Sequence, residues 1–144
     1  MTWSMLDTNI TEIPLWLELV LYSLNIWIKI AYRKQLARWY DEGFHGHTNI
    51  KSIKVAPGCD SSRHLYVIEV DKRDELLLAL NESEIYPGVH YRDNTEYRMY
   101  SYAKGTCPNS HHISERILSL PMHLRMQKSD VDKVVEHVLK FTSM

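Results

Sequence analysis

Residues 13–32 read IPLWLELVLYSLNIWIKIAY, a run that is apolar on nearly every side of a helix. A run of this length can cross a membrane. However, Glu18 lies within it and Lys29 lies near its end, and a charge at the bilayer centre costs about 2.5–3.5 kcal/mol on insertion scales. Asp7 and Glu12 stand where a signal peptide carries basic residues. We therefore predict a long apolar helix whose surface is covered by something outside this chain, and a membrane anchor is disfavoured.

Length and charge favour a soluble protein with one folded domain. The 144 residues leave room for a single domain of common size. The net charge of −1 provides no strong positive field for the phosphates of a nucleic acid. Two cysteines are too few for a disulfide framework and are typical of a reducing compartment. We expect a cytoplasmic protein without a nucleic-acid partner, divided into a divergent apolar segment, residues 1–30, and a folded domain, residues 31–144.

The hydrophobic pattern of the second part predicts alternating helices and short strands. Residues 64–70 (HLYVIEV) are β-branched and aromatic, as in a strand. Asp71 and Ser129 are the expected N-caps of two helices. The full predicted order is helix 32–42, strand 64–70, helix 71–82, strand 89–92, helix 107–116, strand 117–120 and helix 130–141. This order predicts an α+β fold in which a small sheet of about three short strands is covered by helices, with strand directions left open.

No motif in the chain supports a self-contained active site. The candidate metal ligands are Cys107, His111 and His112, together with Cys59, His45 or His47 elsewhere. Zinc sites usually carry paired ligands at two places in the chain, whereas here one cluster exists and its two histidines are adjacent. No nucleophile motif and no glycine-rich phosphate loop occurs. We expect neither a metal site nor a catalytic residue of these classes.

Five blocks in register identify a family resemblance. They are SRHLYVI at residues 62–68, RDEL at 73–76, GVHY at 88–91, ILSLPM at 117–122 and the helix that contains DVDKVV at 130–135. In order and spacing they closely resemble the C-terminal small domain of the DegT/DnrJ/StrS-type sugar aminotransferases, over residues 31–141. The resemblance implies the C-terminal domain of a fold type I enzyme. Full-length members use pyridoxal phosphate (PLP) to aminate keto groups of nucleotide-activated sugars, as dimers with active sites at the subunit interface.

The resemblance also implies that the catalytic groups lie elsewhere. Transamination by PLP needs a lysine for the internal aldimine and a carboxylate at the ring nitrogen, and in the family both precede the region matched here. None of the nine lysines lies in the family's lysine motif. We therefore expect no catalytic residue and no cofactor in this chain alone.

Three functional hypotheses follow from this resemblance. The first is a truncated aminotransferase, inactive alone and connected by resemblance with amino-sugar and surface-polysaccharide biosynthesis. The second is the C-terminal half of a split enzyme, which needs a separate large-domain partner. The third is a non-enzymatic module that binds a nucleotide sugar or forms a homodimer through its apolar helix.

In the family, the small domain forms a wall of the substrate pocket. The resemblance places His90 and Tyr91 near the nucleotide sugar, where His90 can donate to a phosphate oxygen and Tyr91 can pack on the ligand. Many relatives continue with proline, whereas Arg92 would add a cation near a diphosphate. The alternative is that His90 and Tyr91 finish a strand and pack under the tyrosine-rich residues 97–102. Residues 94–106 are either a pocket lid or a packed loop.

The divergent segment has a candidate genetic origin. Residues 22–30 (YSLNIWIKI) can be encoded so that a one-nucleotide change of frame yields VQLKYLDKD, which is similar to the family sequence before this helix. We therefore consider residues 1–30 a candidate frame-shift product. The hypothesis requires the codons of residues 22–30 to give that peptide when shifted.

Overall fold

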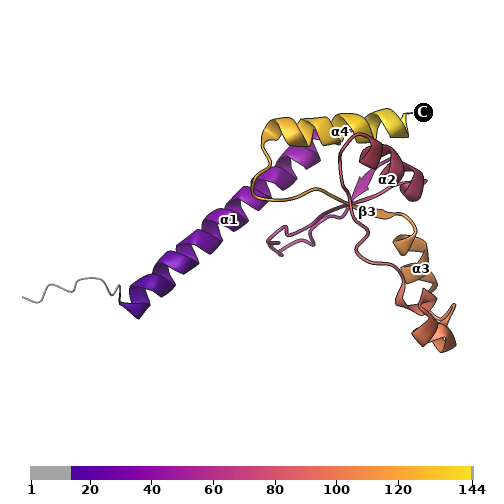
Figure 1. Ribbon diagram of the computed structural model, residues 1–144, viewed down its shortest axis with the longest axis horizontal. Helices are drawn as coiled ribbons and strands as arrows, with labels where there is room; N and C mark the ends of the chain where they lie inside the picture. The colour runs from indigo at the N-terminus through magenta and orange to yellow at the C-terminus, as the bar shows by residue number, and fades with distance from the viewer. Residues whose placement is uncertain (1–13, 144) are drawn as a thin grey trace, which may run out of the picture.

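The computed structural model describes residues 14–143 and is dominated at its N-terminal side by one long helix, α1 (Leu15–Gly43). The apolar run and the predicted helix 32–42 are continuous in it. Its C-terminal part buries Leu36, Ala37 and Tyr40 against the folded body. Its N-terminal part projects away from that body (Figure 1). Ten large apolar side chains of residues 15–28 are exposed, and no residue of the described range 14–143 covers them. The signal-peptide argument on residues 1–12 lies outside the described residues.

The sheet has three antiparallel strands in the order β1-β2-β3: β1 (Lys51–Ser52), β2 (Tyr66–Glu69) and β3 (Ile117–Leu120). Tyr66 lies opposite Leu120 and Glu69 opposite Ile117. The predicted small sheet and α+β class are confirmed, and the strand directions are now defined. The predicted strand 89–92 is wrong, because only Gly88 forms an isolated bridge, to Ser119.

Helices α2 (Arg73–Glu82) and α4 (Lys128–Thr142) cover the sheet, with α4 packed also on α1 (Figure 1). Both predicted N-caps are wrong. Lys72, with a left-handed φ of 54°, stands at the N-cap of α2 in place of Asp71. Gln127 caps α4 in place of Ser129, and its backbone N–H donates to Asp130 Oδ2 over 2.8 Å.

A cluster of aromatic side chains lies in the core where α1 contacts the sheet. The rings of Tyr40 and Tyr66 stack with centroids 4.7 Å apart, and Phe44 stacks on Tyr40 at 6.1 Å. The Tyr40 hydroxyl donates to the carbonyl of Pro121 over 2.8 Å. Four valines of α4 and two leucines of α2 complete this core: Val131, Val134, Val135, Val138, Leu76 and Leu80. The valine stripe predicted for the last helix is therefore confirmed.

A small helical lobe between the Gly88 bridge and β3 lies at the edge of this core. It contains two 3₁₀ segments, η1 (Asn94–Glu96) and η2 (Arg98–Ala103), and helix α3 (Pro108–Ser114). Figure 1 shows it extending from the sheet on the side away from α1. Its single buried position in these three elements is Ser114. The predicted helix 107–116 is present in shortened form, with Pro108 in its first turn.

Candidate functional site

The predicted site residues, His90, Tyr91 and Arg92, follow Gly88, which is fixed to the sheet by two backbone hydrogen bonds. Its N–H donates to the Ser119 carbonyl over 2.9 Å, and the Ser119 N–H donates back over 2.7 Å. A Cβ at Gly88 would lie 2.6 Å from Cε1 of His90. The glycine therefore lets the imidazole fold back against the backbone that β3 anchors.

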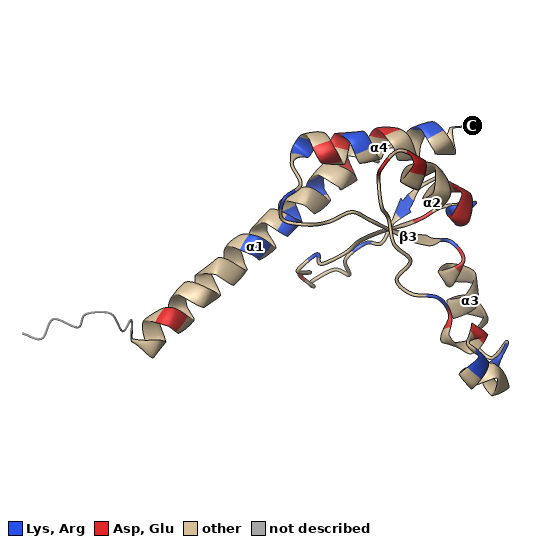
Figure 2. Cartoon of the chain, viewed as in Figure 1, with Lys and Arg blue, Asp and Glu red and all other residues tan. Residues whose placement is uncertain are grey.

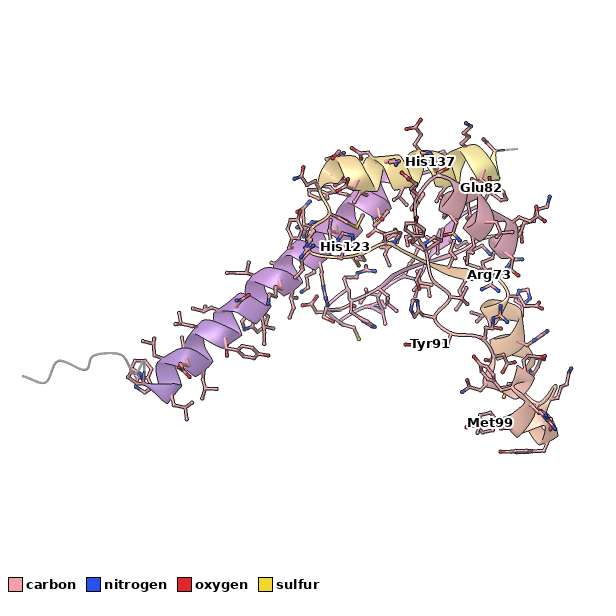
Figure 3. The ribbon with its side chains drawn as sticks, in the orientation of Figure 1. Arg73, Glu82, Tyr91, Met99, His123 and His137 are labelled. Atoms are coloured by element: carbon pink, nitrogen blue, oxygen red, sulfur yellow. The ribbon has the colours of Figure 1, made fainter. Side chains whose placement is uncertain are left out.

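His90 and Tyr91 diverge from this anchor. The peptide bond between them is cis, and their rings meet edge to face with centroids 5.3 Å apart. His90 is half-buried, whereas Tyr91 is 75% exposed. Figure 3 shows the Tyr91 side chain standing clear of the neighbouring ribbon. A ligand over this segment would therefore meet the phenol of Tyr91 first.

Three buried polar atoms near this segment have no hydrogen-bond partner among residues 14–143. They are Nδ1 of His90, Oδ2 of Asp93 and Oγ of Ser119, whose residue is 3% exposed. Buried polar groups normally find a partner, in protein or in solvent. The imidazole and the hydroxyl can each accept or donate, depending on tautomer and rotamer, whereas an ionised carboxylate oxygen accepts. The segment therefore retains hydrogen-bonding capacity that packing within these residues does not use.

Asp93 closes the C-terminal end of the segment. Its side chain is 3% exposed, and Oδ1 accepts from the Thr95 N–H over 2.9 Å. Its Oδ2 lies 3.9 Å from Nδ1 of His111, across the lobe. Asp93 thus fixes the point at which Arg92 leaves the folded surface, and Arg92 itself is exposed. Sequence reasoning missed both Asp93 and Ser119 as neighbours of His90. Asp93 belongs to no recognised block, Ser119 was read only as part of the strand block 117–122, and the burial of both depends on the tertiary fold.

The alternative role, packing under the tyrosine-rich loop, involves different contacts. Tyr100 and Tyr102 meet each other edge to face at 6.5 Å, and Tyr102 is 83% exposed. The aromatic partner of Tyr91 is His90 rather than these tyrosines. The substrate-binding roles of His90, Tyr91 and Arg92 therefore remain predictions.

The two candidate cysteine ligands lie apart from each other, and the candidate ligand His111 has carboxylates as its polar neighbours. Cys59 and Cys107 are both exposed, and they belong to different loops. His111 lies 3.6 Å from Glu96 Oε1 and 3.5 Å from Glu115 Oε1, in addition to Asp93. No group of three potential ligands with metal-binding geometry is present among residues 14–143.

A PLP site would need a lysine held among buried groups that favour its neutral form. All nine lysines of the chain fall within residues 14–143, and none is buried. The least exposed of those in ion pairs, Lys34, donates to Asp60 Oδ2 over 2.5 Å on the surface. The lysines described here therefore do not fit an internal aldimine, and no step of a PLP reaction is assigned to this chain.

Comparison with known proteins settles the family. The model of the DegT/DnrJ/EryC1/StrS aminotransferase family matches residues 21–139. The chain belongs to this family. The match begins within the segment 1–30, which was assigned above to the divergent part.

The relatives are much longer than this chain. A UDP-N-acetyl-3-dehydro-α-D-glucosamine 3-aminotransferase of Acidithiobacillus ferrooxidans is 26% identical over 104 residues, which cover 71% of this chain and 28% of the relative. A family aminotransferase from Brucella abortus is 28% identical with a TM-score of 0.70, covering 81% of this chain and 32% of that one. The aminotransferase TlmJ of Streptoalloteichus hindustanus, 22% identical, superposes with a TM-score of 0.79 over 86% of this chain and 34% of its own. The chain thus spans about a third of the length of these relatives.

The structural matches confirm the expected fold. A sugar aminotransferase of Streptococcus pneumoniae, known in PLP and PMP forms, superposes with TM-scores of 0.74 and 0.72 at 24% identity. At that identity the likeness concerns the fold alone. This family of aminotransferases is PLP-dependent. The chain has the fold of the part of these enzymes that it matches, which is about a third of their length.

Proposed function

We propose that this chain is the small domain of a nucleotide-sugar aminotransferase and forms the substrate-side wall of a pocket whose cofactor-bearing half lies in another domain. The supporting observation is the family match over residues 21–139. In addition, none of the lysines of this chain is buried. When bound to that other domain, PLP supplies the electron sink for moving the amino group. Residues of this chain bind and orient the sugar nucleotide.

Each residue of the segment has a distinct role in this proposal. His90 donates from an imidazole nitrogen to a phosphate oxygen, and its Nδ1 has no competing partner among the described residues. Tyr91 packs its exposed ring on the sugar or base. Arg92, which follows the pair, contributes a planar cation suited to bidentate contact with a diphosphate.

The preferred form of the proposal is a truncated family member that does not transfer amino groups alone. The name of the Acidithiobacillus relative supports a UDP-linked amino sugar as the ligand class, and hence a place in amino-sugar or surface-polysaccharide biosynthesis in the cytoplasm. The runner-up is a split enzyme, in which a separately made large domain restores activity. Both forms use the same wall.

Ligand titration tests the wall directly. We expect UDP-N-acetylglucosamine to shift amide resonances of residues 88–93 with a millimolar dissociation constant, as is typical of half a pocket. Arg92→Gln should weaken this binding about tenfold, because a charge-assisted contact to phosphate is lost. The matched control is Arg98→Gln, which removes another exposed arginine, outside the segment. Absence of any shift at 10 mM, on the order of ten times a millimolar dissociation constant, would refute the wall.

Borohydride trapping tests the assignment of the cofactor to another domain. After incubation with PLP and reduction, we expect only sparse, unspecific labelling, because the lysines are solvated amines. Stoichiometric labelling of one lysine would contradict the proposal. Amino transfer by the purified chain alone would also contradict it, whereas transfer only after addition of a family large domain would favour the split enzyme.

A further inference from the structure

Ser119 and the imidazole of His90 lie on the same face of the sheet. Gly88 and Ser119 donate backbone hydrogen bonds to each other's carbonyl groups, over 2.9 and 2.7 Å. Residues paired in this way across antiparallel segments point their Cβ atoms to one side, about 4.5–5.5 Å apart. The imidazole fills the place of a Gly88 side chain, because a Cβ there would lie 3.2 Å from Nδ1 of His90. Nδ1 therefore lies beside the side chain of Ser119.

This face of the sheet is the one turned away from the apolar core. Leu118 and Leu120 belong to the core, and successive side chains of a strand point to opposite faces, so Ser119 points to the other side. Ser119 is nonetheless only 3% exposed. The imidazole over Gly88 lies on the same side and is placed to exclude water from the serine hydroxyl.

Both polar atoms lack a hydrogen-bond partner among residues 14–143. The two segments that carry them offer no charged partner, since residues 85–91 and 117–122 contain no Lys, Arg, Asp or Glu and are tan in Figure 2. The third buried atom without a partner near this segment, Oδ2 of Asp93, faces His111 at 3.9 Å. Ser119 and His90 are therefore the two groups that can satisfy each other.

The number of donors decides which of the two groups carries the shared proton. If Nδ1 donated, the serine hydroxyl would still hold a buried proton without an acceptor. If the hydroxyl donates and Nδ1 accepts, no buried donor is left unpaired. Buried donors without a partner are rarer in proteins than under-used acceptors. The second arrangement is therefore favoured, and it places the proton of the neutral imidazole on Nε2.

We infer that Ser119 is a positioning residue, whose hydroxyl donates to Nδ1 of His90 and holds the ring in the Nε2–H tautomer. One staggered rotation about χ1 of Ser119, or one ordered water, spans the gap between the two atoms. The consequence for binding rests on the proposed function, because Nε2–H is then the donor that meets a phosphate oxygen. Without the hydroxyl, the imidazole divides between two tautomers, of which one donates from Nε2.

The ring tautomer of the free chain tests the inference before any ligand is added. Proton–nitrogen correlation spectra of the His90 ring at about pH 8.5, where an ordinary imidazole is neutral, should show the proton on Nε2 alone. Ser119→Ala should give a mixture of tautomers, and Ser119→Thr, which keeps a hydroxyl, should restore the single form. The matched control is Ser114→Ala. Ser114 is also buried, but its hydroxyl already donates to the His111 carbonyl over 2.9 Å, so this change should leave the His90 spectrum as it is.

Gly88→Ala is a second variant that acts on the ring instead of the serine. The new Cβ would lie 2.6 Å from Cε1 of His90 and must displace the imidazole. This variant should also give mixed tautomers, and adding Ser119→Ala to it should change the spectrum no further. Near-ultraviolet circular dichroism, which reports the Tyr40 and Tyr66 stack, verifies that the variants fold. A proton on Nδ1 in the unmodified chain, or a His90 spectrum that Ser119→Ala leaves unchanged, would overturn the inference.

Titration with UDP-N-acetylglucosamine separates this inference from the proposed wall. Ser119→Ala should weaken binding about fivefold, the effect of losing one neutral hydrogen bond, and Ser119→Thr should restore it. Unchanged affinity in Ser119→Ala would overturn the positioning role while leaving the wall in place. Conversely, a single Nε2–H tautomer in a chain that does not bind the sugar nucleotide would refute the wall and support the contact between Ser119 and His90.

Discussion

The hydroxyl of Tyr66 donates a hydrogen bond to Oδ1 of Asp41 over 2.7 Å, and this contact joins β2 to the last turns of α1. The Tyr66 residue is 1% exposed, and its ring stacks on Tyr40 of the same helix. The hydrogen bond therefore closes the rim of the aromatic cluster that holds the long helix on the sheet. Its partner Asp41 is exposed, so the contact is screened on one side.

Tyr66→Phe should lower the free energy of unfolding by about 1 kcal/mol, because one hydrogen bond to a carboxylate is lost while the packing stays. Urea denaturation measures the change. The control Tyr102→Phe removes the hydroxyl of an exposed tyrosine and should change stability by less than about 0.5 kcal/mol. Equal effects of the two variants would contradict the assigned contact.

Stability should fall as pH rises above 10. Burial, followed by the hydrogen bond and charge of Asp41, raises the pKa of Tyr66 well above its ordinary value of 10. Burial, followed by the charge of Asp130, raises the pKa of Tyr40 likewise. As pH rises, the unfolded state therefore loses these protons before the folded state does. The contribution of the two hydroxyls to the free energy of unfolding is full below about pH 10 and declines above it. The decline in urea midpoint between about pH 9 and 11, the range that spans an ordinary tyrosine pKa, should be smaller in Tyr66→Phe than in the unmodified chain.

Gly43→Ala should destabilise the packing of α1 on α4. A Cβ at Gly43 would lie 2.8 Å from Cγ2 and 2.9 Å from Cγ1 of Val135. Overpacking of this kind costs about 1–3 kcal/mol, which exceeds the gain of up to about 1 kcal/mol in helix propensity. Thermal and urea unfolding measure the net loss. Combining the change with Val135→Ala should recover part of it, and simple additivity of the two losses would contradict the clash.

Arg73→Met should loosen the contact of α2 with β3. Arg73, which is labelled in Figure 3, is 5% exposed. Its Nη1 donates to the carbonyl of Ile117 over 3.2 Å, and its Nε lies 2.7 Å from Asp74 Oδ1. Methionine preserves much of the apolar stem but leaves the carbonyl without this donor, at a cost of about 1–3 kcal/mol. The control is Leu78→Ala, because Leu78 lies on an exposed part of α2. This change should lower the free energy of unfolding by less than about 0.5 kcal/mol. Hydrogen exchange of the β3 amides provides a local measurement.

Local pattern predicted those elements whose signal is strong over several residues. The β-branched and aromatic run around β2 and the valine stripe of α4 both correspond to observed elements. It failed at β1, where two residues pair with β2 through backbone contacts that carry no side-chain signature. It failed at residues 89–92, because a bridge from Gly88 to Ser119 replaces a strand there.

The N-caps of α2 and α4 were also beyond what the local sequence pattern could predict. Asp71 and Ser129 have the right chemistry, but the chain turns at Lys72 and Gln127 instead. The side chain of Asp71 is instead within ion-pair distance of Arg116. Tertiary contacts therefore decided which polar residue ends each loop.

The candidate site was located through family resemblance rather than through local physics. His90, Tyr91 and Arg92 belong to a recognisable block, whereas nothing in the sequence indicated that Ser119 and Asp93 would lie buried beside them. Those two positions depend on the pairing of Gly88 with β3, a contact across 31 residues of chain that no spacing rule predicts.

The shape of the sheet has a consequence for aggregation. Its outer strand β1 has only two residues, and the outer edge of β3 is occupied at Ser119 by Gly88. Long free edges are what recruit further strands into fibrils, and this sheet offers little backbone for such addition. Conditions that partly melt the fold should therefore give amorphous, helix-mediated precipitates before they give cross-β fibres.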